Sequence, residues 1–206
     1  MANKREYKIV ILGEGRVGKT SLLIKFVRDL FDEHQVSTIN ASFLSKEVVV
    51  GSTSVTLNMW DTAGQERYKG LGPIYYRDAK GALLVYDITD RTSMDRVKYW
   101  VSQLEQQAGG STRIIIAGNK CDLERERNIS KEEAASYARS IGASHISTSA
   151  KSGAGVNELF HEIARLAMEQ DDRERTASAQ QARRGTRSKG MVLQSTTGKP
   201  AKKGCC

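Results

Sequence analysis

Long apolar runs are missing from this sequence. No stretch of its 206 residues approaches the roughly 18 apolar residues that a membrane-spanning helix needs. The first six residues include Lys4, Arg5 and Glu6. The apolar run that follows, 9–12, is shorter than the roughly 7–15 residues of a signal-peptide core. We therefore expect a chain that is neither secreted nor threaded through a bilayer.

Cysteine and histidine are scarce as well. Of the three cysteines, Cys121 stands alone, whereas Cys205 and Cys206 are the last two residues. This distribution argues against a disulfide scaffold. The three histidines are scattered along the chain without the spacing of metal ligands, so they indicate no zinc-type site.

Residues 1–172 carry no net charge, because their 23 lysines and arginines are balanced by 23 acids, and the excess positive charge lies at the end of the chain. Residues 173–206 contain nine lysines and arginines and a single acid, Glu174, so they account for the formal net charge of +8. A nucleic-acid-binding face would combine such charge with aromatic side chains that stack on bases. Because no aromatic residue follows Phe160, we expect no nucleic-acid partner.

Strand-like and helix-like patterns alternate along residues 1–172. Such alternation predicts an α/β fold with a doubly wound, mostly parallel sheet, which binds its ligand beyond the carboxyl ends of the strands. After Asp171 the apolar periodicity stops, so we expect a flexible tail over 173–206. The expected strands are 7–12, 46–50, 55–60, 81–86, 114–117 and 145–147, and the expected helices begin near 19 and span about 92–107, 131–140 and 156–169.

A glycine-rich segment between the first strand and the first helix matches the phosphate-binding pattern G-x-x-x-x-G-K-[ST]. Its glycines allow backbone N–H groups to surround phosphates, and the following helix presents its positive end to the same anion. Lys19 would reach the β- and γ-phosphates, and Thr20 would bind Mg²⁺. A glycine-rich turn without a ligand is the alternative. The candidate residues are Gly13, Glu14, Gly15, Arg16, Val17, Gly18, Lys19, Thr20 and Ser21.

Three further motifs follow expected strands. Asp61 would hold Mg²⁺ through water, because this ion retains part of its hydration shell, and Gly64 would offer its N–H to a γ-phosphate. Guanine presents N1–H and an N2 amine side by side, so a single carboxylate, Asp122, can accept both. Adenine offers no such pair. Residues that would flank the base are Asn119, Lys120, Ser149, Ala150 and Lys151.

These motifs resemble those of the Ras superfamily of small GTPases, and within it the Rab family, over about residues 7–170. The segments 13–22, 41–44 and 71–79 most resemble an endosomal Rab subgroup. The resemblance implies a P-loop small G-domain with a six-stranded sheet flanked by helices, binding GTP or GDP with Mg²⁺. It makes Thr38 a further Mg²⁺ ligand, places Phe31 against the guanine, and assigns Gln65 the orientation of the attacking water. A core position at a helix end is the alternative for Phe31.

The resemblance also implies that the protein binds membranes through lipid groups and that other proteins regulate this binding. Cys205 and Cys206 match the Rab signal for two geranylgeranyl groups, which a Rab escort protein and geranylgeranyl transferase would attach. The expected partners are an exchange factor, a GTPase-activating protein, a GDP-dissociation inhibitor and effectors that read Phe43, Trp60 and Tyr75. We expect a monomer on the cytoplasmic face of endosomal or other endomembranes, with an inhibitor-bound cytosolic pool.

Three other interpretations remain open on the sequence. The protein could be a nucleotide-dependent scaffold with negligible hydrolysis, or a P-loop ATPase or kinase acting on a small substrate. The least favoured is a nucleic-acid binder that uses the basic residues of 173–206.

Overall fold

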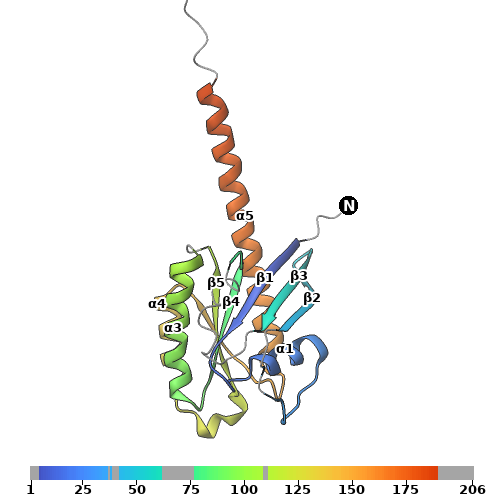
Figure 1. Ribbon diagram of the computed structural model, residues 1–206, viewed down its shortest axis with the longest axis vertical. Coiled ribbons are helices and arrows are strands. Elements are labelled where there is room, and N and C mark those ends of the chain that lie inside the picture. The colour runs from blue at the N-terminus through green and yellow to red at the C-terminus, as the bar shows by residue number, and fades with distance from the viewer. Residues whose placement is uncertain (1–4, 37, 39–41, 62–76, 109–110, 190–206) are drawn as a thin grey trace, which may run out of the picture. The chain divides into compact units, whose positions relative to one another are not determined.

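The computed structural model describes residues 5–36, 38, 42–61, 77–108 and 111–189. Strands and helices alternate along them as the apolar pattern predicts (Figure 1). In chain order the elements are β1 (Arg5–Leu12), α1 (Lys19–Arg28), β2 (Ser42–Val50), β3 (Thr53–Asp61), β4 (Gly81–Asp87), α3 (Arg91–Ala108), β5 (Arg113–Asn119), the 3₁₀ helix η2 (Cys121–Glu126), α4 (Lys131–Ser140), β6 (Ser144–Ser147) and α5 (Val156–Lys189).

The six strands form one sheet in the order β2-β3-β1-β4-β5-β6. β2 pairs antiparallel with β3, and every other pair is parallel. Because these parallel strands all point the same way, the loops at their carboxyl ends gather along one edge of the sheet. The predicted α/β class and the six-stranded, mostly parallel sheet are therefore confirmed.

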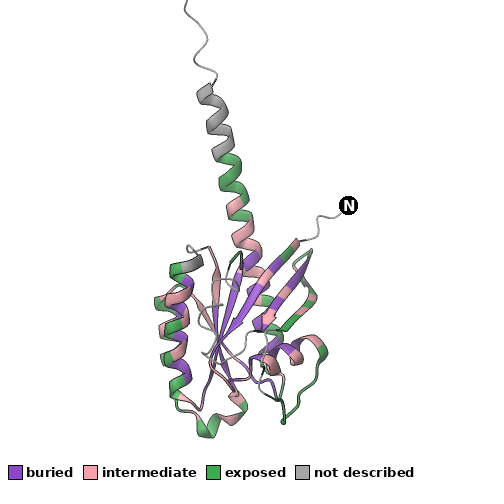
Figure 2. Ribbon diagram, in the orientation of Figure 1, coloured by how far each residue is buried: buried purple, intermediate pink, exposed green. Residues whose placement is uncertain are grey.

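Apolar side chains on alternate positions of the strands bury both faces of the sheet. On β4, Leu83 and Val85 join the cluster that packs under α1 and α5, whereas Leu84 and Tyr86 join the cluster under α3 and α4. All seven residues of β4 are buried, as expected of a central parallel strand (Figure 2).

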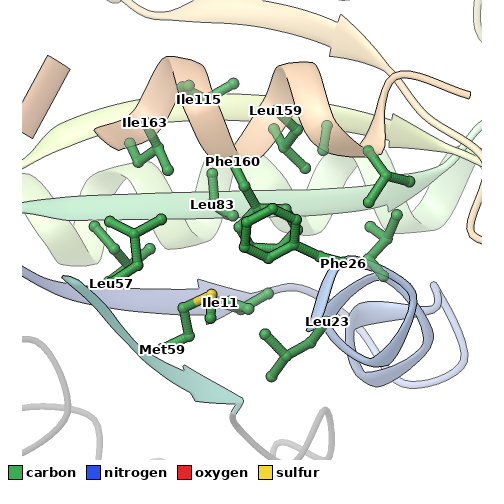
Figure 3. Packing of buried hydrophobic residues seen from close by; sticks show 14 of the residues in the cluster. Ile11, Leu23, Phe26, Leu57, Met59, Leu83, Ile115, Leu159, Phe160 and Ile163 are labelled. Carbon is green, nitrogen blue, oxygen red and sulfur yellow. The ribbon is translucent and has the colours of Figure 1, made fainter. Parts of the chain in front are cut away.

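The layer under α1 and α5 is closed by an aromatic stack. The rings of Phe26 on α1 and Phe160 on α5 lie parallel with centroids 4.0 Å apart, and Leu83 and Ile11 lie beside them (Figure 3). Since α1 begins at the last residues of the glycine-rich loop, this packing holds that loop against the sheet.

Helix α5 continues to Lys189, so the helix end expected near residue 169 is wrong. Residues 1–170 and 171–206 form separate units. In the second unit, Arg175 pairs with Asp171 one turn earlier at 3.0 Å, and Thr176 donates a hydrogen bond to the Asp172 carbonyl. Alanine, arginine, glutamate and glutamine in this segment favour a helix without any burial, which an apolar-period criterion does not detect. Residues 190–206 lie outside the described residues.

Across the described ranges, no helix has both the length and the apolar character required to cross a bilayer.

Candidate functional site

The residues of the predicted nucleotide site that the structure describes gather at the carboxyl ends of the strands. The glycine-rich loop follows β1, Asp61 ends β3, Asn119 ends β5, and Ser149 lies just after β6. The loops around them enclose a cavity of about 610 Å³. Of the predicted residues, those that line it are Glu14, Gly15, Arg16, Gly18, Lys19, Thr20, Ser21, Phe31, Thr38, Asn119, Lys120, Asp122, Ala150 and Lys151.

Two glycines of the loop occupy positions that no other residue can take without rearrangement. Gly13 has a φ of +147°, and a Cβ atom there would lie 2.2 Å from the Val85 carbonyl oxygen. Gly18 has a φ of +92°, and its Cβ would lie 2.4 Å from Nδ2 of Asn119. The loop therefore packs tightly against β4 and β5 at these two glycines.

Lys19, the first residue of α1, is a buried cation held by the loop itself. Its Nζ donates hydrogen bonds of 3.0 Å to the carbonyl oxygens of Gly13 and Glu14, and the residue is only 5% exposed. Burial lowers the pKa of Lys19, while the negative charges of Asp61 and Glu14 raise it. An ammonium group fixed at a helix start, inside a glycine loop, favours an anionic ligand.

Three side-chain oxygens from different elements converge beside this lysine. Thr20 Oγ1 donates to Oδ2 of Asp61 at 2.5 Å and lies 2.5 Å from Thr38 Oγ1. Because Thr20 has a single hydroxyl hydrogen, Thr38 is the donor in the second contact. The predicted trio of Mg²⁺-binding residues is thus assembled in one place.

Asp61 supports the fit of a cation at this point. The residue is fully buried, and its Oδ1 has no hydrogen-bond partner among the described residues. Burial raises the pKa of Asp61, and the hydrogen bond from Thr20 and the charge of Lys19 act in the opposite direction. A buried carboxylate with an unused oxygen is costly unless a cation compensates it. Hydroxyl and carboxylate oxygens are the ligands that Mg²⁺ prefers.

Asn119 ties the loops of the other side of the cavity together. It is 1% exposed, and its Nδ2 donates to the Val17 carbonyl at 2.8 Å. Its Oδ1 accepts from the Ala150 N–H at 3.2 Å and from the Thr148 hydroxyl at 3.3 Å. One amide thus connects the glycine-rich loop after β1 with the loop after β6.

Asp122 lies at the cavity with one carboxylate oxygen engaged. Its Oδ1 accepts a short hydrogen bond from the Ser149 hydroxyl, which also accepts from the Ser152 N–H at 3.0 Å. The two loops thereby orient the carboxylate that the sequence predicts as the guanine acceptor.

Phe31 lines the cavity and is 37% exposed, so its alternative interpretation as a core residue at a helix end is wrong. Phe43 and Trp60 contact each other edge to face at 5.2 Å, and Phe43 is 49% exposed. Gly64, Gln65 and Tyr75 lie outside the described residues.

Sequence reasoning missed two ion pairs at the rim. Lys120 Nζ contacts Asp87 Oδ2 at 2.5 Å, and Lys151 Nζ contacts Glu33 Oε1 at 2.5 Å. Asp87 could have been recognised as a site residue from its position at the end of the apolar strand 81–86. Glu33 carried no comparable signal, because it belongs to no motif.

Comparison with known proteins decides the family. The sequence model of the Ras family matches residues 8–169. The chain belongs to the Ras family. Ras-related protein Rab-21 of Rattus norvegicus is 44% identical over 203 residues, which are 97% of this chain and 91% of that protein. The Homo sapiens protein of the same name is 44% identical with 97% and 90% covered, and that of Dictyostelium discoideum is 46% identical with 79% and 76% covered.

These matches confirm two of the predictions made from the sequence. The chain is a Rab-type small GTPase similar to the Rab-21 proteins, and it is an enzyme that hydrolyses GTP. The roles of individual site residues stay predictions.

Proposed function

We propose that this GTPase is a GDP/GTP switch that hydrolyses GTP slowly and regulates vesicle trafficking at endosomal membranes. The observation that supports it best is the convergence of Thr20, Thr38 and Asp61 beside Lys19. Thr20, Thr38 and Lys19 line the same cavity as Asp122, and Asp61 lies buried behind them. Together these groups match the magnesium ion, the phosphates and the base of a guanine nucleotide.

The phosphates would lie in the loop 13–20, where backbone N–H groups and the start of α1 favour negative charge. Lys19 would exchange its loop carbonyls for β- and γ-phosphate oxygens. Thr20 and Thr38 would bind Mg²⁺ directly and Asp61 through water, and the bound ion would neutralise charge that develops on the phosphates.

The base would lie between the loops after β5 and β6. Asp122 would accept from N1–H and the N2 amine, while the stem of Lys120 and the ring of Phe31 would cover the faces of the base. Ser149, Ala150 and Lys151 would bound its other edge. The hydrogen bond from Ser149 to Asp122 supports this arrangement, because it orients the carboxylate before a base arrives.

Hydrolysis would depend on positioning more than on covalent chemistry, and Gln65 would orient the attacking water. We expect intrinsic turnover of about 10⁻⁴ s⁻¹, typical of small GTPases without a helper arginine, and acceleration by a GTPase-activating protein. Thr38 and Gly64 would contact the γ-phosphate only in the GTP state. Loss of the γ-phosphate on hydrolysis would release the segments that contain Thr38 and Gly64. The surface that effectors read at Phe43, Trp60 and Tyr75 would then change.

Replacing Gln65 with leucine should keep GTP binding while lowering the hydrolysis rate, because the side chain loses the amide that orients water. Single-turnover assays of the full chain with GTP measure this, and the parallel wild-type time course separates a switch from a scaffold. A wild-type chain that binds GTP without turnover would favour the scaffold. An undiminished rate in Gln65→Leu would remove Gln65 from catalysis.

The membrane anchor is proposed to be two geranylgeranyl groups on Cys205 and Cys206. One lipid chain gives marginal binding, whereas two hold a protein stably. An escort protein and transferase would add them, a GDP-dissociation inhibitor would extract the protein as a monomer, and an exchange factor would reload it with GTP. Lys199, Lys202 and Lys203 would add attraction to an anionic leaflet.

Deleting Cys205 and Cys206 should therefore leave nucleotide binding intact and move the protein from membrane pellets to the soluble fraction of cell lysates. Replacing both residues with serine is the matched change that keeps the chain length. Persistent pelleting of both variants would exclude this anchor.

A further inference from the structure

Glu14 is a carboxylate within a loop that we propose to bind phosphates. It lines the cavity, and its side chain is 31% exposed. A carboxylate and a phosphate that share one cavity repel each other, and the low dielectric of a partly enclosed site strengthens this repulsion. An unopposed negative charge here would act against the binding of a nucleoside triphosphate.

Arg96 on α3 opposes this charge. Its Nε donates to Glu14 Oε2 at 3.1 Å, although 82 residues separate the two in sequence. The other carboxylate oxygen, Oε1, accepts from the backbone N–H of Gly15 at 3.3 Å. The Glu14 carboxylate is therefore held from both sides, by a helix and by its own loop.

The position of Glu14 matters for Lys19. The carbonyl of Glu14 accepts one of the hydrogen bonds from Lys19 Nζ, and the negative charge of its side chain is felt at the same ammonium group. A chain of contacts thus runs from Arg96 through the side chain and backbone of Glu14 to the cation that would meet the phosphates.

We propose that Arg96 is a positioning residue for nucleotide binding, which neutralises Glu14 and holds the phosphate loop in its binding conformation. The proposal rests on the nucleotide site put forward above. Arg96 acts through Glu14, so it is distinct from an arginine that would contact the γ-phosphate and accelerate hydrolysis.

The affinities of full-length variants for GTP and GDP, measured by competition against a fluorescent GDP in the presence of Mg²⁺, test this role. Arg96→Gln should weaken GTP binding about 5-fold, the scale of a partly exposed ion pair, and GDP binding less, because GTP carries the greater negative charge. The loss of GTP affinity in Arg96→Gln relative to the wild type should shrink in 0.5 M salt, which screens charges that solvent reaches. Arg96→Lys should restore part of the loss.

The double variant Glu14→Gln/Arg96→Gln provides the deciding comparison. Once the carboxylate is gone, the arginine has no charge to oppose, so GTP affinity should return to within about 2-fold of the wild type. Lys98→Gln is the matched control, since it removes a positive charge from the same helix, where Lys98 pairs with Asp95 at 2.9 Å. It should bind GTP like the wild type.

Other results would overturn the proposal. Equal losses in Arg96→Gln and in the double variant would show that Arg96 supports α3 without compensating Glu14, as would a loss that 0.5 M salt leaves unchanged. Normal GTP affinity in Arg96→Gln would also reject it, while leaving the nucleotide site intact. Failure of the wild-type chain to bind either nucleotide would instead reject the proposed function.

Discussion

Replacing Asp122 with asparagine should weaken GDP binding by about 100-fold or more and improve the binding of xanthosine diphosphate. A carboxylate can accept from both N1–H and the N2 amine of guanine, and hydrogen bonds to a charged group contribute about 1.5–3 kcal/mol each. Asparagine replaces one acceptor oxygen with an N–H donor that faces the N2 amine. Xanthine carries a carbonyl at that position and accepts from the new donor. Competition of GDP, xanthosine diphosphate and ADP against a fluorescent guanine nucleotide measures the exchange of preference.

Asp32→Asn is the matched control, because Asp32 is a carboxylate that lines the same cavity and belongs to no base-binding motif. It should leave the preference for GDP over ADP unchanged. Asparagine at 122 can still accept from the Ser149 hydroxyl, so the variant keeps the contact between the two loops. If ADP competed as well as GDP with the wild-type chain, the guanine assignment would fail and an ATPase or kinase would replace it.

The sequence predicts the elements of this fold where burial is strong. The strands at 81–86 and 114–117 were predicted as continuous apolar runs because both faces of β4 and β5 are covered by helices. The prediction for β2 is too short, since β2 is an edge strand over Ser42–Val50 in which Val48 is the one buried residue. The end of α5 was missed because the helix continues past residue 169 without the apolar period by which a buried helix is recognised.

In the candidate site, too, some features could be predicted from the sequence and others could not. Gly13, Lys19 and Asn119 were predictable because their motifs follow parallel strands, and those strands bring their carboxyl ends together. The contacts of Asp87 with Lys120 and of Arg96 with Glu14 were not, because nothing local in the sequence specifies a partner so far away. Sequence motifs therefore predict which groups meet the ligand, whereas the structure adds which groups hold them.

Asn119→Ala should be the most damaging single change to the framework of the site. It removes the hydrogen bonds to the Val17 carbonyl, the Ala150 N–H and the Thr148 hydroxyl, all of them buried. Each buried polar group left without a partner costs about 1–3 kcal/mol, so the free energy of unfolding should fall by about 3 kcal/mol or more. Urea unfolding of the full chain with excess GDP and Mg²⁺, and after their removal, measures this loss.

The same change should also weaken GDP binding by about 100-fold, because the glycine-rich loop and the loop after β6 lose their common tether while the remaining motif residues are unaltered. Asn128→Ala is the matched control: Asn128 Nδ2 donates to the Thr89 carbonyl at 2.6 Å, but at an exposed position where water can replace it. Asn128→Ala should lower the free energy of unfolding by less than about 1 kcal/mol and leave GDP affinity unchanged. If both variants lost stability equally, the tether would contribute no more than an ordinary surface hydrogen bond. If Asn119→Ala lost stability and kept its affinity for GDP, the two loops would not need Asn119 to form the binding site.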